Sequence, residues 1–204
     1  NMKRINTKEI NGKNFIGMWD IENDNLLKNI IDFFNNNHES HKPGTIALGK
    51  TDKNKKDLLE LTINPKQVKE NKIEIFNEYI NNLIECYNDY QEQWDFLKNW
   101  QRIYIGPFKI EKHLVSGHHL ELNCERQNIN SSHKILSLIT FLNDISDDEG
   151  NIIFNYYNIA IKPKKGTTLI FPSDWTHLHQ QEVMKNSEKF TIRGSFHFPD
   201  TIDY

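Results

Sequence analysis

The sequence has little cysteine, and this scarcity limits the classes of protein to which it can belong. Only Cys86 and Cys124 occur among its 204 residues, they lie far apart, and they form no C-x-x-C pair. Two cysteines are too few for a Cys-based zinc site. A distant pair of this kind indicates free thiols in a reducing compartment.

Long apolar runs and an excess of positive charge are also missing. No segment approaches the roughly 18–20 apolar residues that a membrane-spanning helix needs, and no signal peptide is visible. The chain carries 25 Lys and Arg against 28 Asp and Glu, a net charge of −3, so it has no basic field for nucleic acid. We therefore expect a cytoplasmic protein that binds neither membrane nor nucleic acid.

Two amphipathic patterns predict helices in the first half. Asp24 precedes apolar residues at helical spacing that end at 35–37, which is typical of a capped helix. After Pro65, apolar residues again recur every three or four positions, at Ile73, Phe76, Ile80, Leu83, Ile84 and Tyr87. Leu58–Ile63 suits a short strand. We expect residues 1–100 to be a mainly helical support region.

The second half changes to the pattern of strands. Runs of β-branched and aromatic residues, separated by turns rich in Gly, Pro, Asn and Asp, cover Arg102–Ile110, Lys112–Glu125, Lys134–Leu142, Ile152–Ile161, Thr167–Phe171 and Phe190–Phe198. Short strands at regular spacing predict a sandwich or barrel, on whose outside the helices must pack. The sequence thus indicates one α+β domain over residues 1–204, with its β core in residues 101–204.

Polar residues alternate along one of these strands. His119, Glu121, Asn123 and Glu125 stand at every second position, so their side chains project to the same face. An exposed strand face is the plainer interpretation. If the face is buried, each polar group needs a partner, and the face becomes a candidate site.

A carboxylate and a pair of histidines suggest a metal site. Glu125 precedes His177 and His179 by just over fifty residues, which suits ligands supplied by two different strands. Two His and one carboxylate can hold Fe(II) on one face and leave the remaining positions open. Both His177 and His179 remain candidates for the distal ligand.

Basic residues follow at a suitable distance for a carboxylate co-substrate. Lys189 stands ten positions after His179 and twelve after His177, and could bind the far carboxylate of 2-oxoglutarate by a charge-assisted hydrogen bond. Arg193 falls on the same face of that strand if its side chains alternate regularly. Lys189 and Arg193 are therefore the candidate cofactor-binding residues.

The order of these motifs resembles the prolyl 4-hydroxylase-like branch of the Fe(II)/2-oxoglutarate dioxygenases, in its bacterial and phage form. The matching segments, within residues 102–198, are Asn123–Glu125, Phe141–Asp144, Glu149–Phe154, Lys162–Gly166, Ile170–Pro172, Trp175–His179 and Lys189–Phe190. The resemblance implies a double-stranded β-helix (a jelly-roll or cupin-like barrel), with Fe(II) as cofactor and 2-oxoglutarate as small-molecule co-substrate. It also implies an oxidoreductase that hydroxylates a substrate, with a prolyl residue of a peptide or protein as the first expectation.

The sequence departs from the family pattern at the first metal ligand. The family has His where this chain has Asn123, and a neutral amide is a poorer ligand for iron than imidazole. Three interpretations stay open. Asn123 ligates beside Glu125 and a distal His; or His118 or His119 takes its place; or the site binds no iron.

These interpretations correspond to three functions. An Fe(II)- and 2-oxoglutarate-dependent oxygenase is the first expectation. One alternative is a catalytically degenerate β-helix that acts as a binding module. The other is a cupin-like protein that holds a different metal with His118, His119, Glu121 or Glu125.

Overall fold

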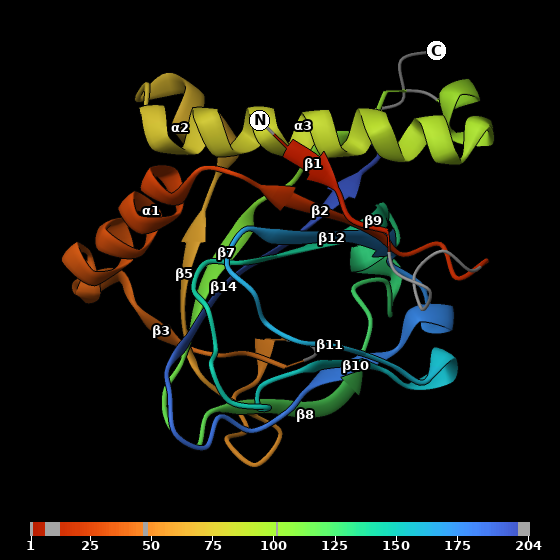
Figure 1. The fold of residues 1–204 in the computed structure, drawn as a ribbon. Coiled ribbons are helices and arrows are strands. Elements are labelled where there is room, and N and C mark those ends of the chain that lie inside the picture. The colour runs from red at the N-terminus through yellow and green to blue at the C-terminus, as the bar shows by residue number, and fades with distance from the viewer. Residues whose placement is uncertain (1, 7–12, 47–48, 101, 200–204) are drawn as a thin grey trace.

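The computed structural model describes residues 2–6, 13–46, 49–100 and 102–199. Two antiparallel sheets face each other, and helices cover the outer face of the larger sheet (Figure 1). This is the predicted double-stranded β-helix. The sheets are separate layers rather than one closed barrel, because no strand pairing joins them within the described residues.

The larger sheet combines strands from both halves of the chain. In spatial order it contains β1 (Met2–Arg4), β2 (Gly17–Ile21), β12 (Thr167–Pro172), β9 (Lys134–Phe141), β14 (Lys189–His197), β7 (Phe108–His113), β5 (Leu59–Ile63) and β3 (Lys42–Pro43), with β6 (Tyr104–Ile105) paired to β14. The smaller sheet contains β11 (Ile159–Ile161), β10 (Ile152–Phe154), β13 (His179–Gln181), β8 (His118–Asn123) and β4 (Lys56–Asp57).

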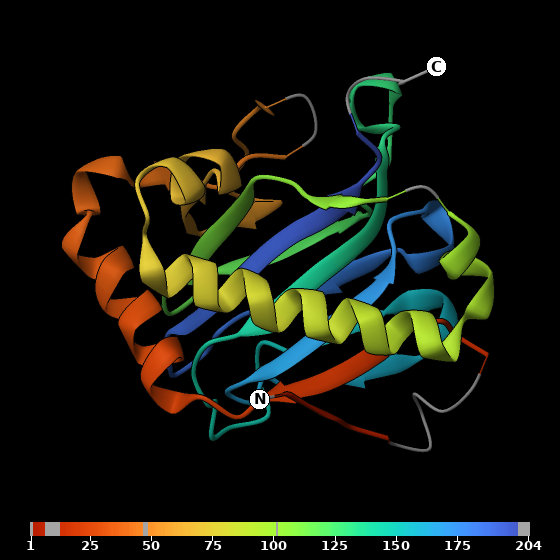
Figure 2. The ribbon, with the colours of Figure 1, turned by 90° about the horizontal axis from the view of Figure 1, so that it is seen from above.

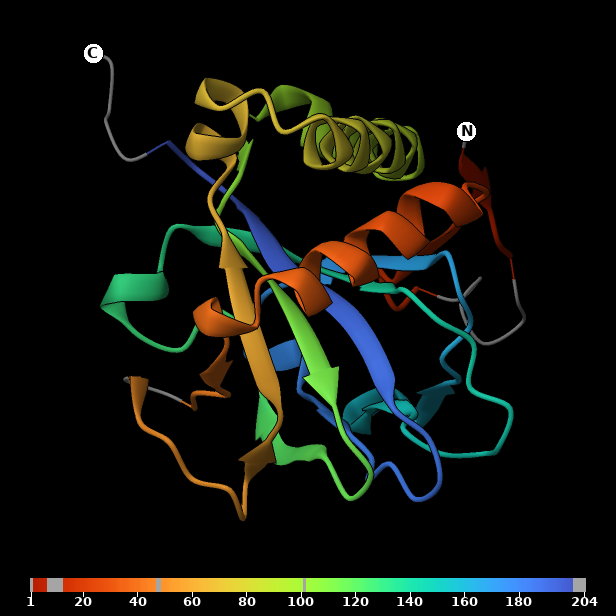
Figure 3. The same ribbon diagram turned by 90° about the vertical axis from the view of Figure 1, so that its left-hand side faces the viewer.

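The helices lie on one side of the molecule. Figure 2 shows α3 (Glu74–Gln93) running across the strands of the larger sheet, and Figure 3 shows α1 (Asp24–Asn36) against the same sheet. The shorter α2 (Pro65–Glu70) precedes α3. Short 3₁₀ turns occur at His38–Ser40, Asp95–Asn99, Ile129–Ser131, Asn155–Tyr157 and Trp175–His177. No helix in the described part of the chain is long and apolar enough to cross a membrane.

The cap of α1 differs from the prediction by one residue. Asn23, not Asp24, is the N-cap, and its side chain accepts a hydrogen bond from the backbone N–H of Leu26 at 3.0 Å. Asp24 lies in the first turn, where its negative charge is favourable near the amino end of the helix. Both residue types suit a helix start, so the sequence alone could not separate them.

Residues 1–100 contain strands as well as helices. The sequence predicted only the strand at 58–63, which is present as β5, whereas β1 to β4 were not predicted. β4 and β5 are separated by Leu58 alone, yet β4 pairs with β8 in the smaller sheet and β5 pairs with β7 in the larger. The chain thus passes from one sheet to the other within a single residue.

The space between the sheets has an apolar end and a polar end. At β9, β12, β10 and β11 it is filled by a buried cluster that includes Phe141, Phe154 and Phe171. At β14, β7, β8 and β13 the buried side chains are instead polar or charged. A second apolar cluster, between the helices and the larger sheet, contains Trp19, Phe34 and Phe76. Because the apolar clusters supply most of the hydrophobic burial, the polar end is free to serve a function.

Candidate functional site

Alternation along β14 builds the polar end of the interior. Lys189, Thr191 and Arg193 are buried on the same face of the strand. Lys189 pairs with His113 of β7, and Thr191 pairs with Glu111. From the facing sheet, His119 of β8 lies opposite Gln181 of β13, and Asn123 lies opposite His179.

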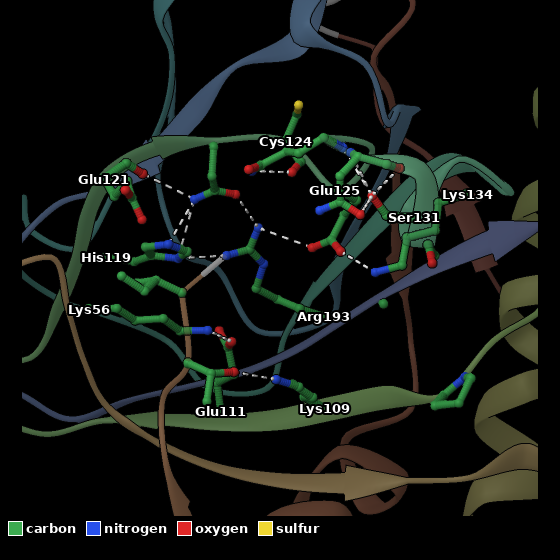
Figure 4. A pocket seen from close by; sticks show the side chains of 18 residues that line it. Lys56, Lys109, Glu111, His119, Glu121, Cys124, Glu125, Ser131, Lys134 and Arg193 are labelled. Carbon is green, nitrogen blue, oxygen red and sulfur yellow. Dashed lines mark hydrogen bonds and ion pairs between the residues drawn. The ribbon is translucent and has the colours of Figure 1, made fainter. Parts of the chain in front are cut away.

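Arg193 is the centre of this polar cluster, as Figure 4 shows. Its Nη1 lies 2.9 Å from Nδ1 of His119, and its Nη2 lies 2.7 Å from Nε2 of His179. The same Nη2 is 3.5 Å from Oδ1 of Asn123 and 3.8 Å from a carboxylate oxygen of Glu125. One guanidinium therefore contacts four side chains that the sequence had marked as candidate metal ligands.

The contact with Arg193 fixes the protonation of His179. A guanidinium only donates hydrogen bonds, so Nδ1 of His119 and Nε2 of His179 must accept. His179 then carries its proton on Nδ1, which donates to the carbonyl oxygen of His177 at 3.0 Å. Burial, together with the charge of Arg193, lowers the pKa of His179 to about 3 and also lowers the pKa of His119. Both rings are neutral at pH 7.

Glu125 supplies the negative charge of the cluster. It accepts a hydrogen bond from Lys134 at 2.7 Å in addition to its contact with Arg193. Burial raises the pKa of Glu125, but the charges of Lys134 and Arg193 outweigh this effect and hold it below its usual range. Glu125 is therefore ionised at neutral pH.

The structure separates the two candidate distal histidines. His179 faces Arg193, whereas His177 is buried with Nε2 2.7 Å from the carbonyl oxygen of Asn14 and Nδ1 2.9 Å from the hydroxyl of Thr176. His118 also lies outside the cluster, because it stands on the opposite face of β8 from His119. The cluster thus brings together Asn123, Glu125, His179 and Arg193, and adds His119.

The residues present do not fit an iron ion. Within the described ranges, no three His, Cys, Asp or Glu side chains are placed to hold a metal. The lone pair of His179 Nε2 that would bind the metal accepts from Arg193 instead. Asn123 offers only a neutral amide, which is a poorer ligand for iron than imidazole. A metal would therefore have to displace a charged side chain that is only 6% exposed.

Lys189 lies deeper in the interior than Arg193. Its side chain is fully buried, and its ammonium donates to the carbonyl oxygen of Gly150 at 2.6 Å. Burial lowers the pKa of Lys189 to about 7, an effect that the charge of Glu111 opposes. Gly150 adopts φ +64°, a conformation that side chains rarely adopt, and a Cβ there would crowd Met184 Sδ. Glycine therefore favours the turn that brings this carbonyl to Lys189.

Several buried polar atoms beside Lys189 or on the facing sheet have no hydrogen-bond partner among the described residues. They are both ring nitrogens of His113, both amide atoms of Gln181, the hydroxyl of Thr191 and one carboxylate oxygen of Glu111. An unpaired buried polar atom costs about 1–3 kcal/mol, so such a concentration indicates groups that await a partner. These residues were not predicted from the sequence. The signal was present, because Glu111 and His113 stand two positions apart on one strand and Lys189 and Thr191 do so on another, so that each pair of polar side chains shares one face.

A cavity of about 270 Å³ opens beside Arg193 and Glu111. His119, Glu121, Asn123 and Glu125 all line it, as alternation along their strand predicted. Two ion pairs lie in its wall, Lys56–Glu111 at 2.9 Å and Lys134–Glu125 at 2.7 Å. Lys109 also lines the cavity, and it pairs with Glu60 at 2.6 Å. The cavity therefore gives a polar route to the cluster.

Comparison with solved structures places this arrangement among known folds. A viral collagen prolyl hydroxylase from Paramecium bursaria Chlorella virus-1, in its 2OG complex, superposes with a TM-score of 0.68 at 12% identity, covering 92% of this chain and 98% of the other. The chain has the jelly-roll fold of the prolyl hydroxylases. A Pseudomonas putida prolyl-4-hydroxylase gives 0.70 at 12% identity, over 91% of this chain and 94% of its own.

A third neighbour was solved with a peptide. It is a prolyl hydroxylase from Trichoplax adhaerens in complex with a fragment of the hypoxia inducible factor oxygen degradation domain, with a TM-score of 0.70, 13% identity and coverage of 91% and 84%. No family model matches the sequence, and neither does any curated protein. At these identities the likeness establishes the fold, and function must come from the site.

Proposed function

We propose that this chain is a metal-independent binding protein that holds a small dicarboxylate between its two sheets, with 2-oxoglutarate as the first candidate. The observation that carries the proposal is Lys189, a fully buried ammonium. Beside it on β14 and β7 lie Thr191 and His113, whose polar side-chain atoms have no partner among the described residues. The bound molecule would supply the counter-charge and the missing hydrogen bonds.

Charge is the first argument. A buried cation is costly unless it is paired, and within the described residues no carboxylate lies within 4 Å of the Lys189 ammonium. The carbonyl of Gly150 takes one of its three N–H donors. Two donors therefore remain for a carboxylate, which forms short, strong hydrogen bonds with ammonium.

Hydrogen bonding is the second argument. The Thr191 hydroxyl, the Gln181 amide and the ring N–H of His113 are further buried donors without partners. They come from β14, β13 and β7, so they would contact a small ligand from both sheets. A mixture of one cation and several neutral donors suits a carboxylate that also bears an uncharged oxygen. The 2OG complex of the viral neighbour supports 2-oxoglutarate as the first candidate.

The test is calorimetric titration of the full chain with 2-oxoglutarate in buffer that contains EDTA, with glutarate and succinate as comparison ligands. We expect one site per chain, lost in Lys189→Met and retained in Lys28→Met, which removes an exposed lysine of α1. The proposal fails if none of the three acids binds the wild-type chain. It also fails if Lys189→Met binds as well as the wild type.

The second candidate is the oxygenase that the sequence resemblance implies, acting on a peptide or protein. The convergence of Glu125 and His179 favours it, and the peptide complex of the Trichoplax neighbour suggests the class of substrate. It requires Arg193 to leave the cluster. Incubation with Fe(II), ascorbate and 2-oxoglutarate separates the candidates, because an oxygenase forms succinate whereas a binding protein returns 2-oxoglutarate unchanged.

A further inference from the structure

We infer that Arg193 is a built-in replacement for the metal ion of this fold. Its guanidinium contacts two imidazoles and one carboxylate, those of His119, His179 and Glu125. These are the group types with which a facial metal site holds its ion. The inference is independent of the proposed ligand, because it concerns a different cation on β14 and a different set of contacts.

The hydrogen bonds of Arg193 occupy the positions that a metal would need. A metal binds the lone pair of a neutral imidazole nitrogen. At both His119 and His179 that lone pair accepts an N–H of the guanidinium, at 2.9 and 2.7 Å. Neither imidazole can serve the metal and Arg193 at the same time. The arginine must leave before either ring can ligate.

Charge leads to the same result. Arg193 is permanently ionised and almost fully buried, and Glu125 is its negative partner in the cluster. Lys134 already shares that carboxylate. A divalent ion placed beside the guanidinium would be repelled by it, and repulsion between charges at this distance is strong in a poorly solvated site.

Asn123 fits an arginine better than a metal. Its amide oxygen lies 3.5 Å from Nη2 of Arg193. A neutral amide offers an acceptor to the guanidinium and adds no positive charge. The asparagine and the arginine therefore form a matched pair, and exchange of only one of them should not create a metal site.

The test compares the wild type with Asn123→His, Arg193→Met and the double variant N123H/R193M, each titrated with Co(II) alone and monitored by its visible absorption. Met keeps the apolar volume of the arginine stem but removes its charge and donors. We expect the double variant to bind one Co(II) at least tenfold more tightly than N123H. Its melting temperature should rise with Co(II) and fall back with EDTA, whereas that of the wild type should respond to neither.

A matched variant isolates the role of charge. N123H/R193K keeps a cation at position 193, and we expect it to bind Co(II) no better than N123H. Tight binding of Co(II) by the wild type, lost in His179→Gln, would overturn the inference, and so would equal binding by N123H and N123H/R193M. Failure of a folded double variant to bind Co(II) would also overturn it. If the double variant does not fold, N123H decides alone: tight binding of Co(II) with the arginine in place would overturn the inference, and its absence would support it.

Discussion

Nη2 of Arg193 lies 2.7 Å from Nε2 of His179, one of the two histidines that the sequence marked as candidates for the distal metal ligand. Because of this contact, the nitrogen that a metal would bind in this fold is already occupied by a hydrogen bond. The strands bring Asn123, Glu125 and His179 to Arg193, and they leave His177 outside the cluster. The positive charge among these side chains is the guanidinium of Arg193.

Binding of 2-oxoglutarate should depend on pH through Lys189. Burial lowers the pKa of Lys189 to about 7, and a bound carboxylate favours the charged ammonium and so raises that pKa. Above pH 7 the free protein must therefore take up a proton when it binds. We expect affinity to fall by up to about tenfold per pH unit between pH 7.5 and 9. Titrations in buffers of different ionisation enthalpy measure the proton uptake, and a heat of binding that is the same in all of them would contradict the prediction.

The free energy of unfolding should fall as the solution becomes acidic, and His113 should contribute. Burial lowers the pKa of His113 far below its usual value of about 6.5. Its stabilising contribution is therefore complete above pH 6.5 and is lost as pH falls below that value, at up to about 1.4 kcal/mol per pH unit. Urea denaturation between pH 7 and 5 measures the slope. His113→Gln removes one titrating ring and should give a shallower slope, and an unchanged slope would contradict this assignment.

The buried pair of Lys56 and Glu111 should be costly to break from one side. Lys56 is 5% exposed and Glu111 is 1% exposed, and their charged atoms are 2.9 Å apart. Lys56→Met leaves a buried carboxylate without its closest partner, a change that costs about 3–5 kcal/mol in such pairs. Removal of both charges in K56M/E111Q should recover part of the loss. Urea denaturation provides the comparison, and additive losses in the double variant would contradict the coupling.

Asn23→Ala should destabilise α1 because it removes the hydrogen bond to the Leu26 N–H. The expected loss is about 1 kcal/mol, typical of an N-cap. Asn23→Ser keeps a side-chain acceptor and serves as the matched control. Thermal denaturation of both variants measures the difference, and equal melting temperatures would mean that this cap contributes nothing.

The fold was predictable in outline because its strands alternate and its helices are amphipathic. β7 and β8 were harder to separate, because the prediction placed one break at Glu111, inside β7, and none at the turn before Gly117. β13 has only three residues and was missed. Short strands leave too few alternations to stand out from loops, and they form because neighbouring strands offer backbone hydrogen bonds.

The members of the cluster were predictable, but their arrangement was not. Alternation placed His119, Asn123 and Glu125 on one face, and Arg193 on the face of Lys189. Sequence spacing says nothing about which cation reaches which partner across two sheets. The sequence assigned Arg193 to the co-substrate, whereas in the structure its guanidinium lies among the candidate metal ligands.

Cys86 and Cys124 are both free and buried. The sequence had indicated free thiols because the two cysteines lie far apart in it.

The one-residue passage at Leu58 has a mechanical consequence. β4 and β5 belong to opposite sheets and are joined by Leu58 alone. Because consecutive Cα atoms are only about 3.8 Å apart, these two strands cannot separate far. This side of the molecule is a rigid corner. Glu111 and Arg193 line the cavity between the sheets, so we expect the proposed ligand to enter as their ion pairs loosen rather than by separation of the sheets.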